Sequence, residues 1–165
     1  MISFSGPAYW YGPVIIVAKG NPLGVKSYDD LKAKRVGSIS GSAADYYLRK
    51  IGVTTTPFKT EIDELQSLNQ GRLEAVLEDD LVYLQFAKTN PSSNMEPLWS
   101  IPVPVDIING GGYGMARFAM RKEDCTLRAA YTQGLAEMRA NGEVSYILHK
   151  YGLTDRNLVM FKLNP

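Results

Sequence analysis

The sequence of 165 residues has little of several features that would point to common protein classes. It contains one cysteine, Cys125, and one histidine, His149, so it cannot form an internal disulfide or supply a Cys/His zinc site. Its longest apolar run, residues 14–18, is far shorter than the roughly 20 residues of a membrane-spanning helix. It also lacks an excess of one charge, because 18 Lys and Arg face 17 Asp and Glu. We therefore expect no nucleic-acid-binding surface.

The amino terminus lacks a secretory-signal pattern as well. Residues 1–7 contain no basic start followed by an apolar stretch, so the sequence as written predicts a cytoplasmic chain. What is present is the composition of a soluble globular protein, with 45% hydrophobic and 21% charged residues. The length suits one ordinary domain or two small lobes.

Hydrophobic periodicity and chain breakers predict strands and helices that alternate at short spacing. Strands are expected over residues 14–18, 35–39, 53–58, 73–78, 95–99 and 113–120. Helices are expected from a capping box of Ser27 and Asp30 to residue 34, and over residues 43–51, 62–69, 80–88, 127–138 and 144–151. Residues 101–112 read as a connector. This alternation favours βαβ units and a mostly parallel sheet, hence an α/β fold. In such sheets ligands bind beyond the carboxyl ends of the strands.

The first place of this kind is the turn after the strand at residues 35–39. Ser40, Gly41 and Ser42, followed by Ala43, open the next predicted helix. Free backbone N–H groups and the helix dipole favour a negative group there. Gly41 permits a close approach to the backbone, and the serine hydroxyls can add hydrogen bonds. The alternative is a plain helix N-cap by Ser42, which is the commoner arrangement.

The second place is the acidic run Glu78, Asp79 and Asp80, directly after another predicted strand. Both places lie at carboxyl ends of strands in one sheet, so we expect them at the same rim. An anion-accepting helix end near a carboxylate suits a zwitterion, with its carboxylate on one and its ammonium on the other. The alternative is that Asp79 or Asp80 merely caps the following helix. A metal pair is less favoured, because no second cluster of oxygen ligands lies nearby.

Other candidate residues carry weaker signals. Tyr9, Trp10 and Tyr11 precede the first long strand and could stack on a ligand, although aromatics that flank a sheet are more often core. His149 reads as a surface or satisfied histidine, because no nucleophile is placed against it. Cys125 lies at a helix start, which alone is weak evidence for a reactive thiol.

Six short motifs follow one another over almost the whole chain. They begin at Phe4 (Phe-Ser-Gly-Pro-Ala-Tyr), Ser27 (Ser-Tyr-Asp-Asp-Leu-Lys-Ala-Lys-Arg-Val-Gly), Ser40 (Ser-Gly-Ser), Leu68 (Leu-Asn-Gln-Gly-Arg-Leu-Glu-Ala-Val), Tyr113 (Tyr-Gly-Met, leading to Arg-Lys-Glu-Asp at 121–124) and Leu135 (Leu-Ala-Glu-Met-Arg-Ala-Asn-Gly-Glu, leading to Lys-Tyr-Gly at 150–152). In this order the set resembles bacterial extracellular (periplasmic) solute-binding proteins of family 3, the amino-acid-binding family that serves ABC importers.

The resemblance implies a periplasmic-binding-protein-like type II fold, in which two α/β lobes close on a ligand between them. Residues 14–108 would form the complete second lobe, and residues 1–13 and 109–165 the hinge strands and a carboxyl-terminal remnant of the first. The implied function is binding of a small zwitterionic solute, an amino acid or derivative, for ABC-type import. The implied partner is an ABC permease, and no cofactor, metal or catalytic residue is expected.

Site roles carry over from the resemblance residue by residue. The turn at residues 40–42 matches the one that donates to the ligand carboxylate, and Asp79 matches the acid that accepts from the ligand amino group. Tyr9 and Tyr11 lie near aromatics that cover the ligand. Ala43 stands where much of the family has a second Ser or Thr, so one hydroxyl contact is missing.

A larger departure concerns the start of the chain. The family begins with further strands and helices of the first lobe, including an arginine that pairs with the ligand carboxylate, whereas this chain starts three residues before Phe4. We therefore expect an amino-terminally truncated lobe and weakened ligand binding. We also expect homodimer formation through an uncovered helical stripe of Leu127, Tyr131, Leu135 and Met138.

Two alternative functions stay open at this point. Some proteins of this fold are dehydratases, for which Glu78 and Asp79 would be the acid–base groups at the rim. The chain could also be a fragment that acts in assembly only. The resemblance implies a periplasmic or extracellular location, in contrast to the cytoplasmic location that the missing signal predicts.

Overall fold

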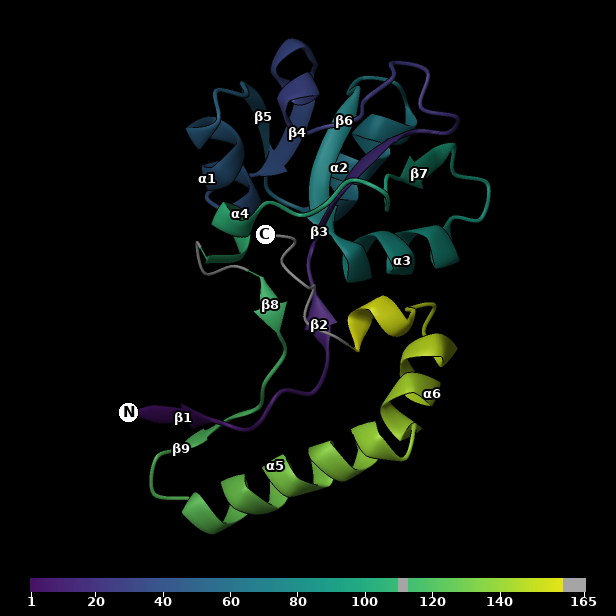
Figure 1. The fold of residues 1–165 in the computed structure, drawn as a ribbon. Coiled ribbons are helices and arrows are strands. Elements are labelled where there is room, and N and C mark those ends of the chain that lie inside the picture. Colours follow the sequence, from purple (N-terminus) through teal and green to yellow (C-terminus); the bar gives the residue numbers. More distant parts are fainter. Residues whose placement is uncertain (110–112, 159–165) are drawn as a thin grey trace. The chain divides into compact units, whose positions relative to one another are not determined.

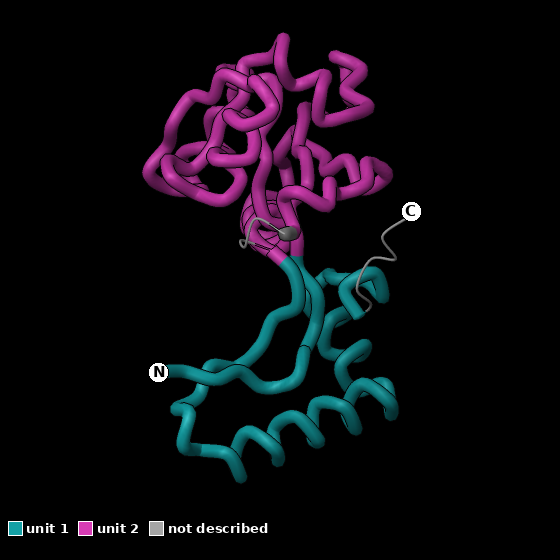
Figure 2. The backbone as a smooth tube through the Cα atoms, turned by 60° about the vertical axis from the view of Figure 1, so that its left-hand side comes forward, with its two compact units in different colours: residues 1–11, 114–165 teal, residues 12–113 magenta. Residues whose placement is uncertain are grey.

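The computed structural model of the chain describes residues 1–109 and 113–158. The chain divides into two compact units, which Figure 2 colours separately. One comprises Gly12–Tyr113, and the other comprises Met1–Tyr11 together with Gly114–Pro165. We call them the sheet unit and the helical unit after their main secondary structure.

The sheet unit is built on a five-stranded sheet with the strand order β5-β4-β6-β3-β7 (Figure 1). Its strands are β3 (Pro13–Ala18), β4 (Val36–Ile39), β5 (Thr55–Phe58), β6 (Ala75–Asp79) and β7 (Met95–Pro97). The expected βαβ units are present, because β4 pairs in parallel with both β5 and β6. The expectation that the sheet is mostly parallel is wrong for β3, which is antiparallel to both its neighbours. A buried apolar run carries no sign of its direction.

Helices cover both faces of this sheet, and residues of β3 alternate between the two cores. Ile15 and Val17 pack with residues of α1 (Ala43–Lys50), α4 (Val105–Asn109) and the 3-10 helix η1 (Asp29–Ala33). Val14 and Ile16 pack with residues of α2 (Glu61–Asn69) and α3 (Asp80–Thr89). A strand with alternate side chains in two cores is fully buried, which explains its uninterrupted apolar sequence.

Two local predictions in the sheet unit need correction. The helix expected from Ser27 is the short 3-10 helix η1, and the Asp30 carboxylate accepts hydrogen bonds from the backbone N–H groups of Lys26 and Ser27 at 2.8 and 2.9 Å. The predicted connector contains α4, because Ile107 buries its side chain in the core beside α1. Tertiary burial therefore overrides the weak local signal of this segment.

In its described residues, the helical unit contains two short antiparallel ribbons and two helices. β1 (Ile2–Phe4) pairs with β9 (Ala119–Arg121), and β2 (Trp10–Tyr11) pairs with β8 (Gly114–Met115). The single strand expected over residues 113–120 is thus two strands. The helices are α5 (Cys125–Ala140) and α6 (Glu143–Lys150), followed by the 3-10 helix η2 (Asp155–Asn157), and Val144 and Leu148 anchor α6 by burial.

The predicted apolar stripe on α5 is present, but its side chains remain largely exposed. No residue of α5 is buried, and Leu127 and Tyr131 are 50% and 45% exposed. Phe118 meets the Tyr131 ring edge-on at a centroid distance of 5.6 Å, and it is half-exposed as well. Apolar side chains therefore gather on an open face of this unit. None of the helices in the described ranges is long and apolar enough to span a membrane.

Gly37 on β4 offers a test of the packing beneath α2. A Cβ atom at this position would lie 2.5 Å from Cδ1 of the buried Leu73 and 3.2 Å from Cγ of Glu64. We expect Gly37→Ala to lower the free energy of unfolding by about 1–3 kcal/mol, because the core must shift to admit the methyl group. Urea denaturation followed by circular dichroism measures this change.

The matched control is Gly134→Ala on α5, where an added Cβ meets nothing within 4 Å. This variant should be neutral or more stable by up to about 1 kcal/mol, since alanine favours a helix. Equal effects of the two substitutions would contradict the packing at Gly37.

Candidate functional site

The two sequence-predicted loops leave the sheet at the same edge. β4 and β6 are neighbours and run in parallel, with Val36 opposite Ala75 and Gly37 opposite Val76. Adjacent strands lie about 4.8 Å apart. The turn that follows β4 and the acidic residue Asp79 that ends β6 therefore emerge side by side. β3 begins at this edge as well, because Pro13 lies opposite Asp79.

The turn at residues 40–42 is tied down by the helix that it opens. The Ser42 hydroxyl accepts a hydrogen bond from the Asp45 N–H at 3.1 Å, so Ser42 is the N-cap of α1, as the alternative prediction had it. The Gly41 N–H donates to the Asp45 carboxylate at 3.2 Å, and Gly41 has φ +76°, which favours glycine. The Ser40 N–H donates to the Phe58 carbonyl at 3.0 Å. These donors are thus engaged within the protein.

Asp45 holds the turn in place. Its carboxylate also accepts hydrogen bonds from Arg49 Nε at 2.9 Å and from the Thr55 hydroxyl at 2.8 Å. Burial works against ionisation of Asp45, but the hydrogen bonds from Arg49, Thr55 and Gly41 together lower its pKa. A charged Asp45 therefore links the turn, α1 and β5 rigidly.

Two backbone donors remain at this helix end. The N–H groups of Ala43 and Ala44 have no acceptor within residues 1–109 and 113–158. A cavity of about 560 Å³ opens beside Ala43 and is lined by Gly41, Ser42, Ala43, Tyr46, Tyr47, Lys50, Asp106 and Ile107. The start of α1 can thus donate to an anionic group.

Asp79 is the half-buried carboxylate at the end of β6. It occupies the N-cap position of α3, yet its side chain makes no capping hydrogen bond. Its backbone N–H donates to Oε1 of Glu78 at 2.8 Å, and the N–H of the buried Asp80 donates to the Gly12 carbonyl at 3.0 Å. The capping alternative therefore does not account for the Asp79 side chain, whose oxygens are left to other donors.

The donor to Asp79 inside the sheet unit is the Tyr113 hydroxyl. Burial raises the pKa of Asp79 to about 6, the hydrogen bond from Tyr113 opposes this rise, and the charges of Asp80 and Glu61 add to it. Burial and the nearby carboxylates raise the pKa of Tyr113, so its hydroxyl keeps the proton that it donates. Tyr113 is not among the predicted site residues, because only the fold brings it to Asp79.

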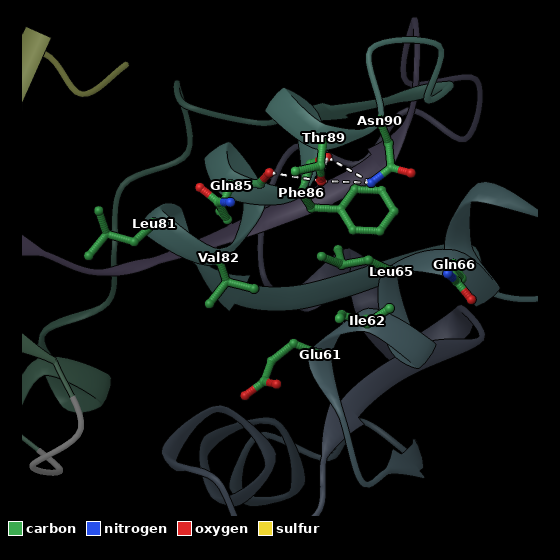
Figure 3. A pocket seen from close by; sticks show the side chains of 10 residues that line it. All are labelled: Glu61, Ile62, Leu65, Gln66, Leu81, Val82, Gln85, Phe86, Thr89 and Asn90. Carbon is green, nitrogen blue, oxygen red and sulfur yellow. Dashed lines mark hydrogen bonds between the residues drawn. The ribbon is translucent and has the colours of Figure 1, made fainter. Parts of the chain in front are cut away.

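A second cavity of the sheet unit, of about 470 Å³, lies between α2 and α3 (Figure 3). Its walls are largely apolar and include Ile62, Leu65 and Val82, while Glu61 and Gln85 lie at its margins. None of the sequence-predicted site residues lines it. The sheet edge with Asp79 therefore remains the better candidate.

Comparison with known proteins matches residues 1–154 to the bacterial extracellular solute-binding proteins, family 3. The chain belongs to this family. The resemblance carried by the six motifs is thereby confirmed. The family is named for solute-binding proteins.

Curated relatives bind amino acids according to their names. The lysine/arginine/ornithine-binding periplasmic protein of Escherichia coli (strain K12) is 29% identical over 154 residues, which cover 91% of this chain and 58% of that protein. The L-cystine-binding protein TcyJ of the same strain is 29% identical over 150 residues, which cover 90% and 53%. The chain thus spans little more than half the length of these relatives.

Solved structures confirm the periplasmic-binding-protein-like α/β fold. The unliganded, open L-cystine solute receptor of Neisseria gonorrhoeae has a TM-score of 0.77 at 20% identity, over 96% of this chain and 63% of that one. An ancestral arginine-binding protein bound to arginine has a TM-score of 0.63 at 30% identity, over 91% of this chain and 64% of that one.

The remaining predicted residues, Tyr9 and Tyr11, lie in the helical unit. Tyr9 and Tyr11 are partly buried, and they flank the buried Trp10. Tyr11 pairs with Gly114 in the β2–β8 ribbon, and the Tyr9 carbonyl accepts from the Ala116 N–H at 2.7 Å. Their side chains belong to a different unit from Asp79, so their role toward a ligand stays a prediction.

His149 and Cys125 take no part in the candidate site. His149 lies on the surface, with Nε2 at 3.2 Å from an Asp155 oxygen, as expected for a surface histidine. Cys125 is exposed, and its thiol donates to the Lys122 carbonyl at 3.5 Å. Among the residues that the structure describes, no group of three His, Cys, Asp or Glu is placed to hold a metal ion.

The raised pKa of Asp79 predicts how stability depends on pH. The folded-state pKa of about 6 lies above the unfolded value near 3.9, so the native state binds more protons between these limits. The contribution of protonated Asp79 to the free energy of unfolding is fully present below about pH 4. It is lost as the pH rises through 6. We expect Asp79→Asn to be more stable than the wild type by roughly 1–2 kcal/mol at about pH 8, with little of this gain at pH 4.

Urea unfolding at the two pH values measures this difference. Tyr113→Phe is the companion variant, because it removes the hydroxyl that favours the ionised form of Asp79. It should lower stability more at pH 8 than at pH 4. An Asp79→Asn protein less stable than the wild type at pH 8 would contradict the assignment of Asp79 as a strained, ionised group.

Proposed function

We propose that the chain binds an amino acid or a close derivative at the sheet edge formed by the start of α1 and Asp79. The observation that carries this proposal is the half-buried Asp79 carboxylate, which does not cap α3 and emerges beside a helix start with two available N–H groups. A ligand ammonium would meet Asp79, and a ligand carboxylate would meet the N–H groups of Ala43 and Ala44. The hydroxyls of Ser40 and Ser42 can add donors.

The names of the relatives support this class of ligand. They refer to lysine, arginine and ornithine, to histidine, and to L-cystine. These molecules differ in their side chains and share an α-ammonium and an α-carboxylate. The sheet edge would bind these two groups, with Asp79 at the ammonium and the start of α1 at the carboxylate. Other contacts would then bind the side chain of the ligand.

We further infer an ABC-type import role outside the cytoplasm, with a permease as the partner. The family is named for extracellular proteins, and one solved relative, 25% identical, is the substrate-binding protein of an amino acid ABC transporter. In this arrangement residues 14–108 are one lobe, and residues 1–13 and 109–165 supply hinge strands and part of the other. The division at Gly12 and Tyr113 supports that assignment. Tyr9 and Tyr11 are further candidates for ligand contacts.

Isothermal titration calorimetry with L-arginine, L-lysine, L-histidine and L-cystine tests the binding. We expect at least one to bind, and Asp79→Asn to weaken it by about 10–100-fold, because a hydrogen bond to a charged group contributes about 1.5–3 kcal/mol. The control is Asp29→Asn, which removes an exposed carboxylate that pairs with Lys32 at 2.7 Å. Equal affinities of wild type and Asp79→Asn would refute the role of Asp79.

The open face of α5 supports a second proposal, a homodimer. Leu127, Tyr131 and Phe118 form an exposed apolar group, and a second copy of the same face would cover it. Light scattering should then give twice the chain mass of 18.3 kDa.

The matched variants place a charge on opposite sides of α5. Leu127→Glu should restore the monomer mass, whereas Ala129→Glu, at an exposed position on the other side, should leave the dimer intact. A wild-type chain that stays monomeric at every concentration up to the millimolar range would overturn the homodimer.

A further inference from the structure

Two buried glutamates of the sheet unit, Glu64 and Glu78, lie within hydrogen-bonding reach of each other. Glu64 on α2 is fully buried, and Glu78 on β6 is 8% exposed. Room for Glu64 comes from Gly37 on β4, because a Cβ there would lie 3.2 Å from Cγ and 3.3 Å from Oε1 of Glu64. The carboxyl group of Glu64 is thus enclosed where α2 packs on the sheet.

Glu64 has to be protonated in this position. No N–H or O–H group within the described part of the chain donates to either of its carboxyl oxygens. An ionised carboxylate without donors cannot be held in a buried site at reasonable cost. Burial and the neighbouring Glu78 raise the pKa of Glu64 to about 9, and as the acid it donates a hydrogen bond to Glu78.

The charged side chains around the pair add to this effect, whereas the Asp79 backbone N–H lowers the pKa of Glu78. The charge of Glu61 on α2 raises the pKa of both glutamates, and the charge of Asp79 raises that of Glu78. Asp80 and Tyr113 in turn shift the pKa of Asp79. Every one of them except the tyrosine is an acid. The pair therefore carries no more than one negative charge near neutral pH, located mainly on Glu78.

Glu78 passes the state of this pair on to the candidate site. Its Oε1 accepts the hydrogen bond from the Asp79 backbone N–H at 2.8 Å. This contact fixes the backbone from which the Asp79 side chain projects. A second charge on Glu64 would repel the Glu78 carboxylate and loosen its hold on that N–H.

We propose that Glu64 and Glu78 share a single proton and act together as positioning residues for Asp79, so that the geometry of the binding edge depends on that proton. This role of the pair deepens the proposed function, and its effect on ligand binding rests on that function. Neither glutamate touches the ligand. The pair acts through the Asp79 backbone, and loss of the proton at alkaline pH releases it.

Nuclear magnetic resonance of the unliganded chain tests the pair without any ligand. Besides the ionisation of Glu78 itself, the Asp79 amide signal should show an inflection near pH 6 from its own carboxyl group and one near pH 9 from loss of the Glu64 proton. The Glu64 carboxyl carbon should titrate with the upper one. Asp79→Asn should remove the lower inflection and keep the upper one. Glu64→Gln, whose amide donates permanently to Glu78, should remove the upper inflection and keep the lower one.

Three outcomes overturn the proposal. One is an Asp79 amide with no inflection near pH 9. Another is an upper inflection that persists unchanged in Glu64→Gln. The third is a Glu64 carboxyl carbon in the wild type that titrates near its ordinary pKa, and this result does not depend on whether any variant folds.

A second experiment compares the affinities of the wild type and the variants for L-arginine at about pH 7 and 9.5. The wild type should lose about tenfold more affinity than Glu64→Gln over this range, and the comparison cancels the titration of the ligand's own ammonium. Glu78→Gln, which keeps an oxygen to accept from Asp79, should retain binding at pH 7, and Glu78→Leu should not. If no amino acid binds at all, the proposed function fails, while the resonance measurements still decide on the pair.

Discussion

The parallel pairing of β4 with β6 is the contact on which the rest of the site depends. It brings the turn at residues 40–42 and Asp79 to one edge of the sheet, although they are far apart in the sequence. The register matters as much as the pairing, because a slip by one residue would turn the Asp79 side chain to the opposite face. Gly37 lies within this pairing and leaves room for Leu73 and Glu64 above the strand.

Several acidic side chains lie close together at this edge, and their ionisation lowers the stability of the folded chain. Burial raises the pKa values of Asp79, Glu78 and Glu64, so each is harder to ionise in the folded chain than in the unfolded one. The structure reduces that cost with a proton on Glu64 and a hydroxyl from Tyr113. A carboxylate kept ionised against its surroundings is typical of a binding group, since stability is given up for function. A ligand ammonium would place a positive charge next to Asp79.

Much of this arrangement could be predicted from the sequence. The breakers and the apolar runs indicated β4, β6 and the helices after them, and the rule for parallel sheets put both loops at one edge. The direction of β3 could not be predicted, because its apolar residues fit either direction equally. Tyr113 and Glu64 were missed for a different reason. Nothing local distinguishes a tyrosine that will meet Asp79, and a glutamate on a polar helix reads as exposed. On α2, Ile62 is 61% exposed while Glu64 is buried, the reverse of what their side-chain polarity suggests.

A titration of the isotope-labelled chain with L-arginine, L-histidine and L-cystine, followed by amide resonances, tests the central claim most directly. Binding of a zwitterion at the sheet edge predicts that the amide signals of Ala43, Ala44 and Asp79 move together with one saturation curve. Shifts confined to the groove between α2 and α3, or no shift with any of the three amino acids, would contradict the assignment of the site.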